Sequence, residues 1–214
     1  MKQYKLYLFD LDGTLIDSDQ MLIETFHELY AKYRPGFLPS DDYIRQFSGP
    51  QITETLRNEF PDEDQTVMLD EYRNRSRKYY DQYVRLFPKA YELLEKLAKN
   101  NIPFAIITNK HRYATKYTYE LLDLEKFDIF SVCADDVKNL KPAADGIYKA
   151  MEHFGIENKD DVIYIGDCYT DYLSSKNAGV NFGYIAWSPR PIKGKIKIDV
   201  NIKDYGTFAE DIDV

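Results

Sequence analysis

The sequence predicts an α/β protein, in which a parallel sheet covered by helices on both faces carries an inserted domain built only of helices. Two observations carry this prediction. Short apolar strands alternate with amphipathic helices through the second half of the chain, which is typical of a parallel sheet. One further apolar strand lies near the N-terminus, and a long run of helical patterns separates it from the others. We therefore expect a Rossmann-like core formed by residues 1–14 and 86–214, with a helical cap at 15–85.

The first strand is expected at residues 4–9, where an alternating pattern ends in a fully apolar stretch. Residues 19–33 repeat apolar side chains at intervals of three and four, which predicts an amphipathic helix. Gly-Pro and Pro-Asp pairs interrupt the pattern that follows. Three more helices are expected between these breaks, at 41–47, 51–60 and 65–83. Residues 15–85 are thus predicted to be helices without a strand.

From residue 86 onward, helices and strands alternate. Helices are expected at 88–99, 112–122, 142–154 and 170–178. Strands are expected at 102–107, 128–133, 162–165 and 181–186. Repeated β-then-α units of this kind imply parallel strands connected by helices. Near the C-terminus, Lys193, Lys195 and Lys197 alternate with Gly194 and Ile196, which favours an exposed edge strand over a binding patch.

The composition excludes several classes of partner. The chain of 214 residues has 28 Lys and Arg against 36 Asp and Glu, a formal net charge of −8. A chain this acidic lacks the broad positive field that attracts nucleic acids or anionic membranes, so neither partner is expected. No signal-peptide core and no apolar stretch of about 18 residues is present, which favours a cytoplasmic location. The number of subunits stays open between a monomer and a homodimer.

Polar side chains follow several of the predicted strands. Ligands of open parallel sheets bind beyond the carboxyl ends of the strands, so these side chains are expected at one common edge. The residues are Asp10, Asp12, Thr108, Asn109, Lys141, Asp167 and Asp171. Four carboxylates so close together require a cation, and ligands that are all oxygen favour Mg²⁺ over a softer metal. Mg²⁺ is therefore the expected cofactor.

This set of residues fits phosphoryl transfer, which needs a nucleophile, a proton shuttle and neutralisation of negative charge. Asp10 could attack phosphorus to give an aspartyl-phosphate. Asp12 could protonate the leaving oxygen and later deprotonate the hydrolytic water. Their places at the strand end do not by themselves distinguish the nucleophile from the acid and base.

Ligands for the metal and for the phosphate are expected from the remaining groups. The Asp10 carboxylate, the Asp12 backbone carbonyl and Asp167 could hold Mg²⁺, and Asp171 either completes or orients this set of ligands. Three further groups are expected to bind the non-bridging phosphate oxygens: the Thr108 hydroxyl, the Asn109 backbone N–H and the Lys141 ammonium.

Four motifs carry a family resemblance. They are DLDGTLIDS at Asp10–Ser18, IITNK at Ile106–Lys110, KP at Lys141-Pro142 and GDCYTD at Gly166–Asp171. In this order they resemble the haloacid-dehalogenase-like superfamily, in its branch of small phosphatases with a helical cap after the first strand. The resemblance implies Asp10 as nucleophile and Asp12 as acid and base. It also implies Mg²⁺ as cofactor and a small phosphorylated metabolite as substrate.

Comparison within the superfamily narrows the expected reaction. Asp12 is retained, which favours an oxygen leaving group, because dehalogenase members lack this carboxylate. Mutase members tend to carry valine where Thr14 stands and an arginine three residues beyond a cap glycine, whereas Ile52 follows Gly49 at that distance. Residues 47–51 are similar to the cap loop of phosphoglycolate-phosphatase-like and pyrophosphatase-like members. The alternatives are a sugar-phosphate mutase and a catalytically silent binding protein on the same fold.

Overall fold

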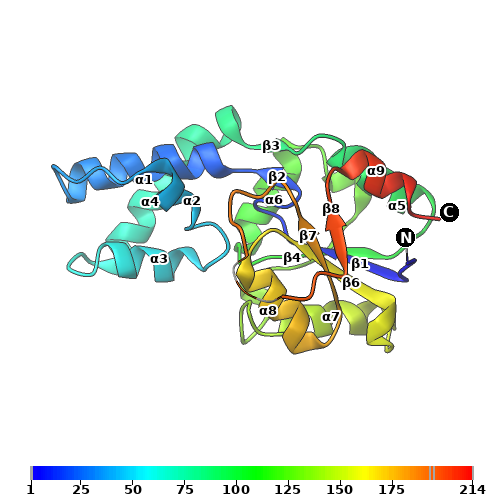
Figure 1. The fold of residues 1–214 in the computed structure, drawn as a ribbon. Helices are drawn as coiled ribbons and strands as arrows, with labels where there is room; N and C mark the ends of the chain where they lie inside the picture. Colours follow the sequence, from blue (N-terminus) through cyan, green and yellow to red (C-terminus); the bar gives the residue numbers. More distant parts are fainter. Residues whose placement is uncertain (1, 193, 195, 214) are drawn as a thin grey trace. The chain divides into compact units, whose positions relative to one another are not determined.

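The computed structural model describes residues 2–192, 194 and 196–213. They divide into two compact units, Met1–Ile16 with Leu86–Val214, called the core below, and Asp17–Arg85, called the helical unit (Figure 1). Within the described residues, no helix has both the length and the hydropathy that a membrane crossing requires.

The core contains a six-stranded sheet in the order β5-β4-β1-β6-β7-β8, in which every neighbouring pair is parallel. The strands are β1 Leu6–Phe9, β4 Phe104–Ile107, β5 Phe130–Val132, β6 Val162–Gly166, β7 Asn181–Ile185 and β8 Val200–Ile202. Strands β1, β4 and β6 are buried along their whole length, as expected where helices cover both faces. The predicted parallel α/β sheet is confirmed.

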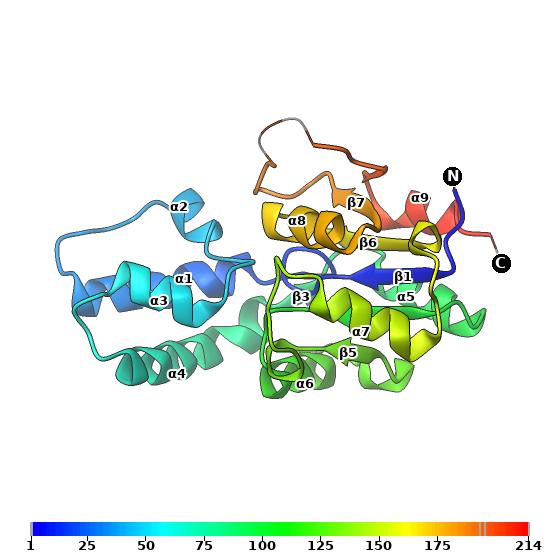
Figure 2. The same cartoon turned by 90° about the horizontal axis from the view of Figure 1, so that it is seen from below.

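Helices cover both faces of this sheet. They are α5 Ala90–Lys99, α6 Arg112–Leu121, α7 Asp145–Phe154, α8 Tyr169–Ala178 and α9 Tyr205–Glu210. Helix α7 packs on β1, β4 and β5, and α8 packs on β6 and β7 beside it (Figure 2). Helices α5 and α9 pack against each other on the opposite face (Figure 1).

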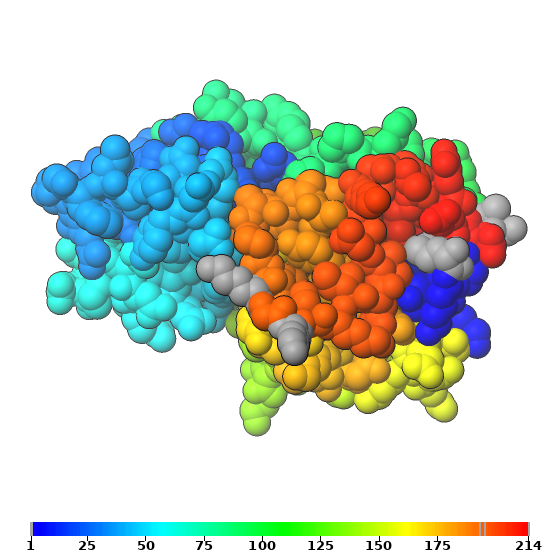
Figure 3. Space-filling view, in the orientation of Figure 1, coloured from blue at the N-terminus to red at the C-terminus, as the bar shows by residue number. Residues whose placement is uncertain are grey.

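Successive side chains of β1 point to opposite faces of the sheet, so this one strand contacts helices on both faces. Leu6 and Leu8 are fully buried in a cluster with Ile147 of α7. Tyr7, between them, points the other way and meets Phe208 of α9 edge-on, with the ring planes at 74°. The segment from β7 onward, orange to red in Figure 3, forms much of the core's surface on the side shown there.

The helical unit consists of α1 Asp19–Tyr33, α2 Asp41–Arg45, α3 Ile52–Glu59 and α4 Gln65–Tyr83. Its apolar cluster joins Leu22 and Phe26 of α1 to Leu56 of α3 and Met68 of α4. The start of α4 is fixed by Asp64, whose carboxylate accepts hydrogen bonds from the N–H groups of the first turn.

The prediction of helices throughout residues 15–85 is wrong at both ends. Two short strands, β2 Ile16–Asp17 and β3 Arg85–Leu86, form a separate two-stranded sheet. Strand β8 and helix α9 were not predicted. Three 3₁₀ helices in the described part of the chain were not predicted either: Glu125–Phe127, Ala134–Asp136 and Lys159–Asp161. The described residues of the predicted edge strand at 193–197, which are Gly194, Ile196 and Lys197, do not form a strand; Lys193 and Lys195 lie outside the described residues.

Candidate active site

The topology brings three motif-bearing strand ends together, because β4, β1 and β6 are neighbours in the sheet. The Asp10 N–H donates to Ile165 O over 2.9 Å, and the Thr108 N–H donates to Val132 O over 3.0 Å. These bonds extend the sheet pairing by one residue, so the polar residue that follows each strand starts from a fixed backbone position. The edge expected to carry the chemistry is therefore assembled in the core.

The loop after β1 folds back tightly on itself. The N–H groups of Leu15 and Ile16 both donate to Leu11 O over 3.0 Å. Gly13 adopts φ +82°, and an added Cβ would lie 2.5 Å from Asp167 Oδ2. Only glycine satisfies both the left-handed backbone and this close approach.

Lys141 joins two buried carboxylates. Its Nζ donates to Asp10 Oδ1 over 2.6 Å and to Asp171 Oδ1 over 2.8 Å, and all three side chains are buried. Burial by itself lowers the pKa of Lys141, but the charges of Asp10 and Asp171 outweigh it and raise that pKa well above its ordinary value. Lys141 is thus a permanent cation between the first and last motifs.

Asn109 holds Lys141 in place through its backbone. The Asn109 Oδ1 accepts from the Lys141 N–H over 3.0 Å, and the Asn109 Nδ2 donates to the Lys141 carbonyl over 3.2 Å. The Asn109 side chain therefore links the second motif to the third. The neighbouring Thr108 is buried, and its Oγ1 accepts from the Lys110 N–H over 3.2 Å.

Asp171 is an anchor for the loop after β6. Its Oδ2 accepts from the N–H groups of Asp167 and Cys168, at 3.2 and 3.3 Å, and from the Cys168 Sγ at 3.1 Å. Its Oδ1 accepts from the Tyr164 hydroxyl over 3.1 Å as well as from Lys141. Burial raises the pKa of Asp171, but Lys141 and these donors lower it below its ordinary value.

The pKa values of Asp10 and Asp167 shift in the opposite direction, upward. Burial, opposed by Lys141 and reinforced by the other carboxylates, raises the pKa of Asp10 to about 8. Burial, opposed by Arg190, raises the pKa of Asp167 to about 6. Both carboxyl groups therefore lack enough nearby positive charge to be stable as anions, which is the condition that a bound divalent cation relieves.

Two cations were not predicted as site residues. Lys110 Nζ lies 2.7 Å from both oxygens of Asp12, and both side chains are partly buried. Arg190 Nε lies 2.7 Å from Asp167 Oδ2, and Arg190 is only 5% exposed. Lys110 could have been found from its place in the IITNK motif. Arg190 lies in a Ser-Pro-Arg-Pro segment after β7, which has no periodicity that would have marked it.

The donors present fit Mg²⁺. Ligand atoms of Asp167, Cys168 and Asp171 lie within 4.8 Å of one another, and Asp10 is tied to the same cluster through Lys141. Cys168 offers no thiolate, because burial and the neighbouring carboxylates raise the pKa of its thiol well above the ordinary value. The available donors are then carboxylate and carbonyl oxygens, which suit a hard divalent cation.

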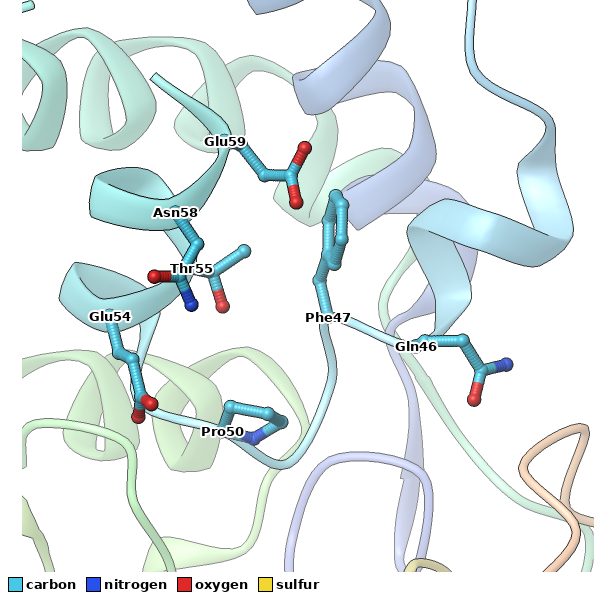
Figure 4. A pocket seen from close by; sticks show the side chains of 7 residues that line it. All are labelled: Gln46, Phe47, Pro50, Glu54, Thr55, Asn58 and Glu59. Atoms are coloured by element: carbon cyan, nitrogen blue, oxygen red, sulfur yellow. The ribbon is translucent and has the colours of Figure 1, made fainter. Parts of the chain in front are cut away.

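A separate pocket of about 160 Å³ lies inside the helical unit. Figure 4 shows Phe47 on one side of it and α3 side chains on the other. Its lining is Gln46, Phe47, Pro50, Glu54, Thr55, Asn58 and Glu59. Glu59 accepts hydrogen bonds from the Tyr30 and Tyr43 hydroxyls, so this carboxylate is part of the packing of the unit.

A comparison with protein families matches residues 7–185 to the haloacid dehalogenase-like hydrolases. The chain belongs to this family. The match spans all four motifs and both units. The predicted family and the predicted enzyme class, a hydrolase of the phosphatase type, are confirmed.

Relatives of this hydrolase include the pyrophosphatase PpaX of Oceanobacillus iheyensis, 31% identical over 85% of this chain and 83% of the relative. PpaX of Halalkalibacterium halodurans is 32% identical over 86% of this chain and 84% of the relative. Among solved structures, a Lactobacillus plantarum protein assigned as a phosphoglycolate phosphatase has a TM-score of 0.84. It is 21% identical and covers 98% of this chain and 99% of its own, which supports the fold.

Proposed function

We propose that this hydrolase is a Mg²⁺-dependent phosphatase that acts on a small phosphorylated metabolite through an aspartyl-phosphate on Asp10. The observation that carries the proposal is the position of Asp10. Its carboxylate is buried at the end of the central strand β1 and is held on one oxygen by Lys141, which leaves the second oxygen for attack. The match to the haloacid dehalogenase-like hydrolases supports hydrolysis as the reaction at this site.

Asp12 is the proposed acid and base. It is two residues from Asp10, on the loop that Gly13 folds back, and its side chain is 22% exposed. That exposure suits a group that must meet both a leaving oxygen and a water molecule. Lys110, which holds both Asp12 oxygens, is proposed to position this carboxylate between the two proton transfers.

Asp10, the Asp12 carbonyl and Asp167 are proposed to hold Mg²⁺. The ion would neutralise charge on the phosphoryl oxygens. Asp171 is proposed to orient the site without ligating the metal, because each of its oxygens already accepts two or more hydrogen bonds from the protein, one of them from the charged Lys141.

The phosphate is proposed to bind to Thr108, Asn109 and Lys141. The Asn109 side chain is engaged with the Lys141 backbone, so its own contribution to the phosphate is the backbone N–H. Lys141 supplies a charge that Asp10 and Asp171 keep protonated. Together they would bind the non-bridging oxygens, whose charge spreads during transfer.

The names of the relatives support a proposal for the substrate class. Those at 31–32% identity are named pyrophosphatases, and the solved structure with a TM-score of 0.84 is assigned as a phosphoglycolate phosphatase. We propose pyrophosphate as the first candidate substrate and phosphoglycolate as the second. Residues 15–85 are proposed to be a helical cap domain, and residues 1–14 and 86–214 are proposed to be the catalytic core. The protein is proposed to work in the cytoplasm, as a monomer or homodimer.

The experiment is phosphate release by the purified protein from pyrophosphate, phosphoglycolate, para-nitrophenyl phosphate and a panel of sugar phosphates. Turnover that needs Mg²⁺ and stops with a chelator supports the proposal. No turnover on any member would favour a silent binding protein. Interconversion of hexose phosphates without phosphate release would favour a mutase. The fold is compatible with that alternative, because a solved structure assigned as a β-phosphoglucomutase from Thermotoga maritima is similar to this chain. Its TM-score is 0.68, and it is 22% identical over 89% of this chain and 88% of its own.

A further inference from the structure

Arg190 is buried against the carboxylate that is proposed to bind the metal. Its Nε donates to Asp167 Oδ2 over 2.7 Å, and the two side chains are 4% and 2% exposed. The Ser188 Oγ donates to the same oxygen over 3.2 Å and accepts from the Arg190 N–H over 3.0 Å. Two donors from one short segment after β7 therefore converge on Oδ2.

The other Asp167 oxygen is less strongly engaged. Oδ1 accepts one hydrogen bond of 3.3 Å, from the Thr14 hydroxyl, which is neutral and at the long end of the hydrogen-bond range. A charged donor at 2.7 Å binds a carboxylate oxygen much more strongly. The carboxylate is thus held through Oδ2, and Oδ1 is the oxygen better placed to accept a cation.

The guanidinium has little room to move away. Gly13 borders it so closely that an added Cβ would lie 2.3 Å from Arg190 Nη2. The same Cβ would lie 2.5 Å from Asp167 Oδ2, so the Gly13 backbone closes over the ion pair. Arg190 is therefore a fixed part of the site.

The charges of the cluster show what Arg190 does there. Three buried carboxylates, Asp10, Asp167 and Asp171, are paired with two buried cations, Lys141 and Arg190. Without Arg190 the cluster would carry one more uncompensated negative charge. That charge would destabilise the metal-free protein and would attract a divalent cation more strongly.

We propose that Arg190 is a permanent counter-cation that binds Asp167 together with Mg²⁺. Arg190 occupies Oδ2, so that the metal binds Oδ1. Its charge weakens metal binding and stabilises the core when no metal is bound. Arg190 is in this account a positioning residue. The proposal rests on the proposed Mg²⁺ site, and its test measures metal binding separately from turnover.

The test compares Mg²⁺ dissociation constants, measured by calorimetry, of the wild type, Arg190→Gln and Arg190→Lys. Fluorescence of Trp187 gives a second binding signal, because it is the single tryptophan and directly precedes Ser188. Loss of the charge in Arg190→Gln should tighten Mg²⁺ binding about tenfold or more and lower the melting temperature of the metal-free protein. Arg190→Lys keeps the charge and should bind Mg²⁺ as the wild type does.

Arg75→Gln is the matched control. Arg75 is a partly buried arginine of the helical unit, paired with Glu28 and Glu71, so the variant makes the same change in net charge away from Asp167. It should leave the Mg²⁺ affinity unchanged. Equal or weaker Mg²⁺ binding by Arg190→Gln overturns the proposal, because a merely structural role predicts that result. If neither the wild type nor Arg190→Gln binds Mg²⁺, the proposed metal site falls, and this proposal falls with it.

A measurement on the wild type does not depend on whether a variant folds. In the metal-free protein the Arg190 Nε–H should give a separate NMR signal that exchanges slowly with water, because it is buried and hydrogen-bonded. The proposal predicts that this signal persists when Mg²⁺ saturates the site. Its collapse to the position of a solvated arginine would show that the metal displaces Arg190, and would overturn shared use of Asp167.

Discussion

Lys141 Nζ lies 2.6 Å from Asp10 Oδ1 and fixes the carboxylate at the end of β1. The same ammonium reaches Asp171 at 2.8 Å, so one cation serves two buried anions. The arrangement explains why Asp171 has a lowered pKa whereas Asp10 has a raised one. Asp171 has further donors that stabilise its anion, and Asp10 is left with the smaller share of positive charge.

Replacing Lys141 by methionine should therefore lower the stability of the protein as well as its activity. The variant leaves Asp10 and Asp171 buried without their shared cation, for which a loss of about 3–5 kcal/mol in the free energy of unfolding is expected. Urea unfolding with and without the second change Asp10→Asn checks this. The loss should be smaller in the Asp10→Asn background, and additive losses would contradict the shared ion pair.

The raised pKa values predict how metal binding depends on pH. Asp10, at about 8, and Asp167, at about 6, hold protons in the folded protein that they would have lost when unfolded. Their protonation favours the metal-free fold at low pH, and this advantage is lost as the pH rises towards 8. Mg²⁺ competes with these protons, so the rise in melting temperature on adding Mg²⁺ should be larger at pH 8.5 than at pH 5.5. A rise that is equal at both pH values would contradict this account.

Gly13→Ala tests the close packing of the first loop. The residue has φ +82°, and its Cβ would meet Arg190 and Asp167. The backbone strain alone should cost about 1–3 kcal/mol, and the collision should add to it and disturb metal binding. Gly36→Ala is the control, because Gly36 has φ +92° with no atom within 4 Å of the added Cβ. Equal effects in both variants would mean that the collision does not matter.

Asp12→Asn tests the acid role. If Asp12 protonates the leaving oxygen, turnover should fall roughly 10²–10⁴-fold on alkyl phosphates and much less on aryl phosphates, whose leaving groups need no proton. Rates across a series of leaving groups give the answer. The same loss on every substrate would argue against the acid role.

Local signals explain which parts of the fold could be predicted. Helix α4 spans Gln65–Tyr83, as predicted, because the proline and the capping aspartate before it fix its start. Strands β2 and β3 have only two residues each and depend on pairing with a distant segment, which leaves no periodic pattern in the sequence.

The site residues also differ in whether a local sequence pattern marks them. Asp10 and Asp167 could be expected at one edge, because each directly follows a buried strand. Arg190 could not, because its place beside Asp167 results from the path of an irregular segment more than twenty residues later in the chain. The roles of these residues in catalysis remain predictions from motif and geometry.

Direct detection of a phosphorylated Asp10 tests the central claim. Turnover is quenched in the Asp12→Asn variant, in which the second step should be slow, and the protein is then reduced with borohydride, which converts an aspartyl-phosphate to homoserine. Peptide mass spectrometry should find homoserine at position 10 only when substrate and Mg²⁺ are both present. An unmodified Asp10 under conditions of measurable phosphate release, or homoserine at position 12 instead, would contradict the proposed covalent mechanism.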